Sequence, residues 1–226
     1  MFQQSNPQEF TMPQTGIAPT FFGKVMSAFG LAILVSCVGV WFSFNYLLEY
    51  FMQNQALIWI VFIAELVLIF TSRSWSTKKP LNYWLFSLFA LLTGIVISPL
   101  LFVATVVGGT GIVIKALLAT FLTFTAAGII GWTTQKSLEG IGGFLMMALI
   151  GMLIVGVIGI FIPWGTQFEM IYAGIGVILF SAFAVFDFNR IKRFPEDRYI
   201  DAAMHLYLDM FNLFIFILRL LMASRN

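Results

Sequence analysis

The stretch FLMMALIGMLIVGVIGIFI (residues 144–162) decides the fold class, because it contains no charged side chain over the thickness of a bilayer. A helix needs about 20 mostly apolar residues to cross the roughly 30 Å of hydrocarbon in a membrane. A barrel strand would instead alternate apolar and polar residues at every second position, and this stretch does not. It therefore predicts a membrane-spanning helix.

Similar apolar stretches lie on both sides of it along the chain. The seven spans predicted in this way are residues 25–47, 56–72, 81–103, 112–132, 141–162, 170–190 and 199–221. They divide the chain into a polar N-terminal tail at residues 1–20 and a seven-helix transmembrane domain at residues 21–222. The predicted fold class is an all-α polytopic membrane protein.

The composition excludes other classes of protein. Hydrophobic residues make up 60% of the chain and charged residues only 10%, whereas a soluble domain carries roughly 25% charged residues. Disorder is excluded because it needs low hydrophobicity and high charge. Cys37 is the single cysteine, so a disulfide scaffold is excluded. A net charge of +2 gives no indication of a nucleic-acid partner.

The basic residues predict the orientation, because Lys and Arg concentrate in short cytoplasmic loops. Nine of the 12 fall on one side of the predicted spans. These nine are Lys24, Arg73, Lys78, Lys79, Lys136, Arg190, Lys192, Arg193 and Arg198. We therefore expect a cytoplasmic N-terminus, and seven spans then place the C-terminus outside.

The seventh predicted span carries five polar residues that share one face of the helix. At 100° per residue, Asp201, His205, Asp209, Asn212 and Arg219 lie on one stripe about 80° wide. The remainder of that helix is apolar. A helix of this kind is expected to be central, with its stripe facing protein or water. The stripe is either a functional path or an internally satisfied polar seam that holds the bundle together.

Asp187 lies near the end of the sixth predicted span, in FDFNRIKR (186–193). It is either an interfacial carboxylate neutralised by Arg190 or a partner of Asp209 on the next helix. A turn centred on Pro195 would leave the two aspartates offset by about 9 Å along the helices, at 1.5 Å per residue. Tilt or a broken sixth helix would close that gap.

Contact between Asp187 and Asp209 would have a specific chemical consequence. Two carboxylates in a low-dielectric site do not both ionise easily, so the pair would share a proton near neutral pH. At higher pH it would separate or take up a cation. Calcium prefers several oxygen ligands, and two carboxylates with Asn212 or backbone carbonyls would suit it. This chemistry predicts a proton-sensitive cation path.

Two further ionisable residues belong to the second predicted span. Glu65 lies halfway along it and either lines the same path or is protonated and hydrogen-bonded. Arg73 ends the span, where it is either an ordinary positive-inside residue or a partner for an aspartate. Ionisable groups within a span cost at least about 2.5–3.5 kcal/mol, so each is a functional candidate.

Several segments resemble the Bax inhibitor-1 family, also called the transmembrane Bax inhibitor motif family. The resemblance covers residues 21–222, and its most specific part is the last span. The segments that carry it are LYLDMFNLFIFILRLL (206–221), AVFDFNRIK (184–192), GWTTQKSLEGIGGFLMMALIGML (131–153) and LTGIVISPL (92–100).

The resemblance implies a seven-helix bundle around a central seventh helix, and a pH-sensitive calcium leak controlled by the pair Asp187 and Asp209. It also implies an arginine latch on one aspartate, for which Arg73 is the nearest match. Phe186, Phe188 and Asn189 depart from the family's usual Tyr, Thr and Gln. The likeness to bacterial members predicts the cytoplasmic (inner) membrane of a bacterium.

Three functions compete at this stage. The first is the calcium leak channel, with Ca²⁺ and H⁺ as the permeating or bound ions and no cofactor. The second is a non-transporting regulator that binds a membrane-protein partner, such as a membrane protease or a stress or cell-death component. The third is an intramembrane aspartyl protease, which is disfavoured because Leu206, Tyr207 and Leu208 replace the Gly-x-Gly that precedes Asp in that class. We therefore expect a protein that is not an enzyme.

Overall fold

The computed structural model describes residues 19–162 and 164–225. The predicted polar tail, residues 1–20, falls outside the described residues except for its last two positions. Within the described residues the secondary structure is helical and contains no strand. The predicted all-α class is confirmed.

The described chain forms seven helical segments that are long and apolar enough to cross a membrane. One short 3-10 turn, η2 (Glu196–Arg198), precedes the last helix. The helices are α1 (Pro19–Phe42), α2 (Leu48–Gln53), α3 (Gln55–Trp75), α4 (Leu81–Gly108), α5 (Thr110–Thr133), α6 (Glu139–Phe161), α7 (Thr166–Ile191) and α8 (Tyr199–Ala223).

The first spanning segment is longer than the sequence predicts. A π-helical turn, η1 (Ser43–Leu47), joins α1 to α2, and together they form a continuous span from Phe21 to Gln53. The Ser43 side chain is buried there and hydrogen-bonds to Ser98 of α4. Because a π turn is a local distortion within a helix, the hydropathy pattern alone does not reveal it.

The connection between α4 and α5 is a single glycine. The sequence predicts a loop between residues 103 and 112, but helix continues on both sides of Gly109, whose φ is 70° and ψ is 175°. This conformation is essentially restricted to glycine, since a β-carbon would clash with the backbone. Gly109 therefore sets the reversal of the chain between two neighbouring spans.

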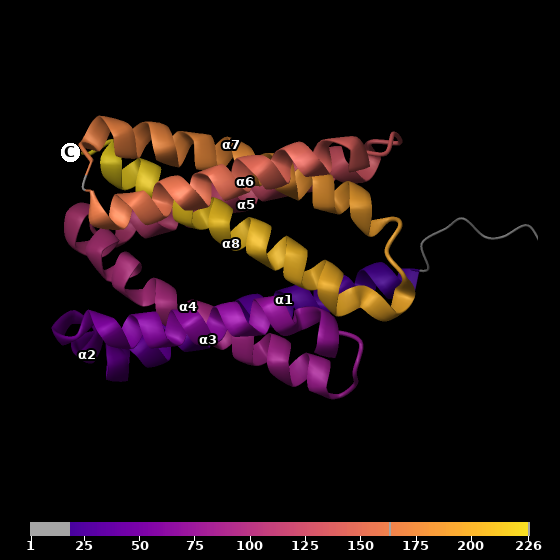
Figure 1. The fold of residues 1–226 in the computed structure, drawn as a ribbon, viewed down its shortest axis with the longest axis horizontal. Coiled ribbons are helices and arrows are strands. Elements are labelled where there is room, and N and C mark those ends of the chain that lie inside the picture. Colours follow the sequence, from indigo (N-terminus) through magenta and orange to yellow (C-terminus); the bar gives the residue numbers. More distant parts are fainter. Residues whose placement is uncertain (1–18, 163, 226) are drawn as a thin grey trace, which may run out of the picture.

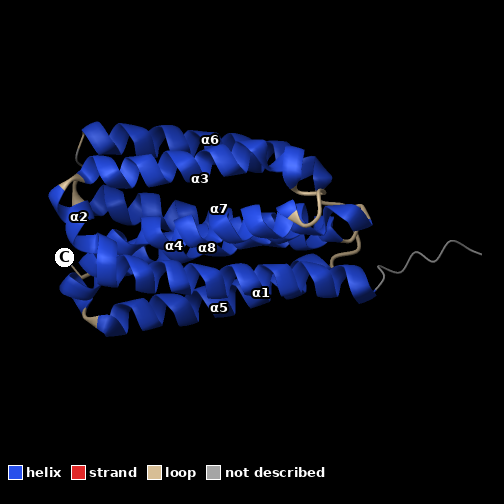
Figure 2. Cartoon of the chain, turned by 90° about the horizontal axis from the view of Figure 1, so that it is seen from below, coloured by secondary structure: helices blue, strands red, loops and turns tan. Residues whose placement is uncertain are grey.

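The helices form two layers with α8 between them (Figure 1). One layer contains α1, α3 and α4, and the other contains α5, α6 and α7. Helix α8 runs diagonally between the layers and packs against α7, α1, α5 and α4. The last span is therefore central, as the sequence predicts. Figure 2 shows the same bundle from below, with the helices aligned along one axis.

Two helices lie at the outside of the bundle. Only 6% of the apolar window of α3 and 11% of that of α6 is buried, against 50% for α8. Helix α3 packs mainly on α4, and α6 packs on α7. Because lipid is as apolar as these surfaces, the exposed faces of α3 and α6 are suited to contact with acyl chains.

Because the seven spanning segments alternate in direction, the nine basic residues named above all lie at the same end of the bundle. We call this end the basic end. The starts of α1, α4, α6 and α8 and the ends of α3, α5 and α7 lie there. In Figure 1 this end is on the right, opposite the C-terminus.

The Gly109 conformation gives a matched stability test. Gly109→Ala is expected to lower the free energy of unfolding by about 1–3 kcal/mol, because alanine disfavours the glycine-only region of φ and ψ. The control is Gly111→Ala, a position inside α5 with open space around its Cα. Thermal unfolding of the two variants in detergent should separate them, and equal melting temperatures would contradict this explanation of the turn.

Candidate functional site

Helices α7 and α8 pack against each other more extensively than any other pair in the described bundle. Asp187 of α7 and Asp209 of α8 both face this interface and are 4% and 5% exposed. Their carboxyl groups are neighbours across this interface, and each affects the electrostatics of the other. The structure thus brings together the two aspartates that the sequence singled out.

The axial offset between the two aspartates is closed by helix tilt. Asp187 lies four residues before the end of α7, and Asp209 lies ten residues after the start of α8, which corresponds to an offset of about 9 Å. Helix α7 is unbroken through Ile191, so a broken sixth span is not the reason. Instead α8 crosses the bundle diagonally (Figure 1).

The surroundings of the pair contain little compensating charge. The Nδ1 atom of His205 lies 3.6 Å from Oδ2 of Asp187, and Arg190 is a more distant positive charge on the same helix as Asp187. Oδ2 of Asp209 is buried and accepts no hydrogen bond from the described residues. Two such carboxyl groups are stabilised most simply by one shared proton.

His205 connects the buried pair to the basic end. Its side chain is 46% exposed, whereas that of Asp187 is 6% exposed. The imidazole therefore lies between the pair and the surface.

The other residues of the polar stripe on α8 have separate partners. Arg219 Nη2 lies 3.0 Å from Oε2 of Glu169 on α7, and its guanidinium group lies over the ring of Tyr172. Asp201 pairs with Arg198 at 3.1 Å. The Nδ2 group of Asn212 donates to the Leu208 carbonyl of its own helix, at 2.8 Å. The stripe is therefore largely a seam between α7 and α8.

Glu65 and Arg73 lie on α3, away from the aspartate pair. Glu65 is 7% exposed, and its Oε1 accepts a 2.6 Å hydrogen bond from Oγ1 of Thr93 on α4. Arg73 is exposed at the end of α3 and takes part in no ion pair within residues 19–162 and 164–225. Helix α3 makes no extensive contact with α7 or α8.

Asn189 is a positioning residue that the sequence reasoning treated only as a departure from the family pattern. Its Nδ2 group donates to the carbonyls of Gly131, Thr134 and Lys136, and its Oδ1 accepts from the Leu138 amide. These bonds satisfy free groups at the end of α5 and fix it to α7 close to Asp187. The signal for this role in the sequence was the amide side chain of Asn189, which stands beside aromatic residues in FDFN (186–189).

The described residues around the aspartate pair do not form a preformed metal-binding site. Among residues 19–162 and 164–225, no group of three or more His, Cys, Asp and Glu side chains is arranged to bind a metal ion. A Ca²⁺ ion usually takes six to eight oxygen ligands. At this pair, two carboxylates would have to be supplemented by water and backbone carbonyls.

Together the fold and the site define an integral, multi-pass membrane protein whose central last helix buries one half of an aspartate pair. The chain belongs to the Bax inhibitor family. It matches the family model described as "Inhibitor of apoptosis-promoting Bax1" over residues 18–226, which confirms the resemblance drawn from the sequence.

Individual relatives are bacterial and eukaryotic. An uncharacterized protein of Helicobacter pylori is 34% identical over 173 residues, covering 75% of both chains. The inner membrane protein YbhL of Escherichia coli is 26% identical over 228 residues, covering 92% of this chain and 93% of YbhL. Bax inhibitor 1 of Schizosaccharomyces pombe is 28% identical over 166 residues, covering 73% of this chain and 61% of the yeast protein.

Proposed function

We propose that this protein is a pH-sensitive calcium leak channel, gated by protonation of the Asp187 and Asp209 pair. The observation that carries the proposal is the burial of two neighbouring carboxyl groups between two helices of a membrane-spanning bundle. Such groups are costly within a membrane and are retained mainly for function.

The gating step follows from competition between a proton and a cation for the same oxygens. With one shared proton the pair is a closed contact between α7 and α8. Loss of that proton leaves two negative charges that repel each other or bind a cation. Ca²⁺ should therefore bind more tightly at pH 8 than at pH 6, and a bound proton should displace it.

The seam around the pair is suited to such a rearrangement. His205 lies beside Asp187 and is half exposed, so a movement of its side chain would change the surroundings of the pair directly. Arg219 and Glu169 hold the far end of the same two helices together. A hinge between α7 and α8 would then open at the aspartates while the opposite end stays paired.

Two neighbouring aspartates would also suit an intramembrane aspartyl protease, so that function is an alternative. The residues before Asp187 are Ala184, Val185 and Phe186, and neither aspartate carries the Gly-x-Gly-Asp sequence. A non-transporting regulator that binds a membrane partner is the remaining alternative. It uses the pair only as an internal latch and is distinguished by the absence of ion flux.

The channel proposal is tested in liposomes that contain the purified full chain and a Ca²⁺-sensitive dye. Flux is expected to depend on pH between about 6 and 8, because the pair must lose its shared proton before it binds a cation. Asp187→Asn and Asp209→Asn should each remove that pH dependence and change the flux about tenfold, the effect of about 1.4 kcal/mol on a barrier.

The matched control is Asp201→Asn, which alters an aspartate on the same helix that pairs with Arg198. It should retain the pH dependence. Absence of flux from the wild-type protein, or an unchanged pH profile in both aspartate variants, would contradict the channel. Loss of a partner's proteolysis or assembly without any flux would favour the regulator.

We also propose that the basic end faces the cytoplasm, because nine of the 12 Lys and Arg residues lie there and such residues concentrate in cytoplasmic loops. The N-terminus is then cytoplasmic and the C-terminus outside. In a bacterial host, alkaline phosphatase fused after Asn226 is expected to be active and green fluorescent protein at the same position dark. The reverse pattern would overturn this orientation.

A further inference from the structure

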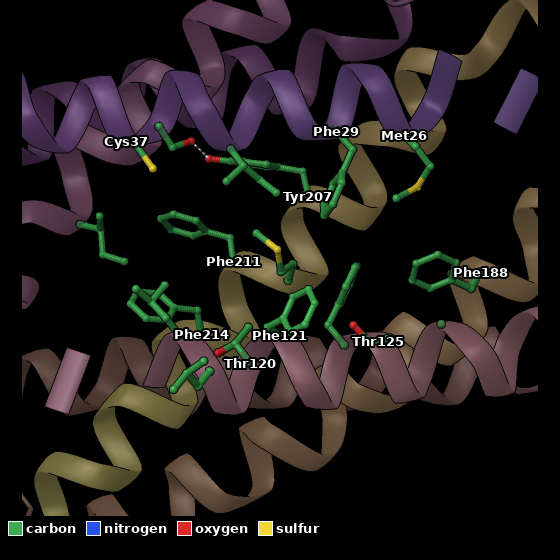
Figure 3. Close-up of a pocket in the computed structure, with 18 of the residues that line it drawn as sticks. Met26, Phe29, Cys37, Thr120, Phe121, Thr125, Phe188, Tyr207, Phe211 and Phe214 are labelled. Atoms are coloured by element: carbon green, nitrogen blue, oxygen red, sulfur yellow. Dashed lines mark hydrogen bonds between the residues drawn. The ribbon is translucent and has the colours of Figure 1, made fainter. Parts of the chain in front are cut away.

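A long apolar cavity of about 1150 Å³ lies between α1 and α5, with α8 as its back wall (Figure 3). Side chains from all three helices point into it. They include Met26, Phe29 and Cys37 from α1, Phe121 from α5, and Phe211 and Phe214 from α8. The cavity is larger than the roughly 300–1,000 Å³ of ordinary small-molecule sites.

The cavity exists because α1 and α5 do not pack closely. The two helices make no extensive backbone contact. Aromatic pairs bridge them instead: Phe29 stacks on Phe124 with ring centres 5.6 Å apart, and Phe22 meets Trp132 at 4.6 Å. The space between the helices is thus held open by large rings rather than closed by small residues.

One side of the cavity is open at the depth of the membrane interior. Leu117, Leu118 and Phe121 form part of its rim and are 53%, 57% and 66% exposed. All three lie in the first half of α5, a helix that spans the bilayer. The medium outside this opening is therefore hydrocarbon.

Only an apolar chain suits this space. A cavity lined by apolar side chains stays dry, and an empty one leaves its lining without dispersion contacts. The elongated shape along α1 and α5 in Figure 3 matches an extended occupant rather than a compact one. Acyl chains are the material available at this depth.

The ammonium group of Lys192 lies beyond the end of the cavity nearest the basic end. Trp132 and Thr133 line the cavity there. The Lys192 ammonium group donates to the Trp132 carbonyl at 2.7 Å and to the Thr134 carbonyl at 2.8 Å. Basic pockets between spanning helices at this level attract anionic lipid head groups.

We propose that the cavity between α1 and α5 is a binding site for one anionic membrane phospholipid, with an acyl chain along α8 and the phosphate at Lys192. The bound chain contacts Tyr207, Phe211 and Phe214, on the face of α8 opposite Asp209. The site does not depend on the proposed channel activity.

The test uses the purified full chain with a phosphatidylglycerol that carries a photoreactive diazirine in its acyl chain. Cross-links should map to α1, α5 and α8, and native mass spectrometry should detect one retained lipid. Unlabelled phosphatidylglycerol should compete for these cross-links but not for those on the outer face of α3. This arm needs no variant and therefore does not depend on folding of a mutant.

Two tryptophan variants provide the matched comparison. Ile33 lines the cavity, whereas the neighbouring Leu34 points outward and is 66% exposed. Ile33→Trp should fill the cavity and lower lipid retention about tenfold, as expected for a loss of about 1.4 kcal/mol in binding. Leu34→Trp should leave retention unchanged. Lys192→Gln should remove the preference for phosphatidylglycerol over phosphatidylcholine.

Several outcomes would overturn the proposal. Equal lipid retention by Ile33→Trp and Leu34→Trp would show that lipid covers the protein surface without a specific site. Competition that is no stronger at the cavity than on α3 would show the same. An unchanged head-group preference in Lys192→Gln would refute the phosphate position. Displacement by a free fatty acid as effectively as by phosphatidylglycerol would assign the site to fatty acids instead.

Discussion

The contact between the Asp187 and Asp209 carboxyl groups is the interaction on which this structure depends. Hydrocarbon offers no hydrogen-bonding partner, so each polar group inside a spanning bundle must be satisfied by protein. Asp187 and Asp209 are neighbouring acids at the α7 and α8 interface, where Oδ2 of Asp209 has no partner among the described residues and a proton shared by the pair would satisfy it. This explains why α8, which carries Asp209 and the polar stripe, lies at the centre rather than at the lipid surface.

The two faces of α8 have different roles. One face meets α7 through His205, Asp209 and Arg219, so that polar contacts hold the two helices at both ends. The opposite face carries the aromatic rings that form the back wall of the cavity. Any rotation or shift of α8 that separates the aspartates would also change the shape of the cavity, so the aspartate pair and the proposed lipid site are linked through α8.

The buried polar groups outside this seam hold the rest of the bundle in place. Tyr207 of α8 hydrogen-bonds to Ser36 of α1 at 2.6 Å, and Glu65 bonds to Thr93 between α3 and α4. Asn189 joins the end of α5 to α7. Each bond satisfies two groups that lipid would leave unpaired, which gives the layers a defined register around α8.

The sequence predicts the class, the spans and the central last helix because these follow from hydropathy and from the polar stripe that includes Asp209. It also names both aspartates, but their contact depends on the tilt of α8, which is set by packing against four helices. The glycine turn at Gly109 is missed because the apolar pattern does not record backbone angles. The cavity is missed because it results from the spacing of α1 and α5, held by rings such as Phe29 and Phe124.

Infrared spectroscopy of the reconstituted protein tests most directly whether the pair holds a shared proton. We predict a carbonyl stretch of a protonated carboxyl group at neutral pH that disappears when the pH is raised or Ca²⁺ is added, and that is absent from the double variant Asp187→Asn/Asp209→Asn. A spectrum without such a band would contradict the shared proton. So would a band that persists in the double variant, which would assign the protonated carboxyl to another residue such as Glu65.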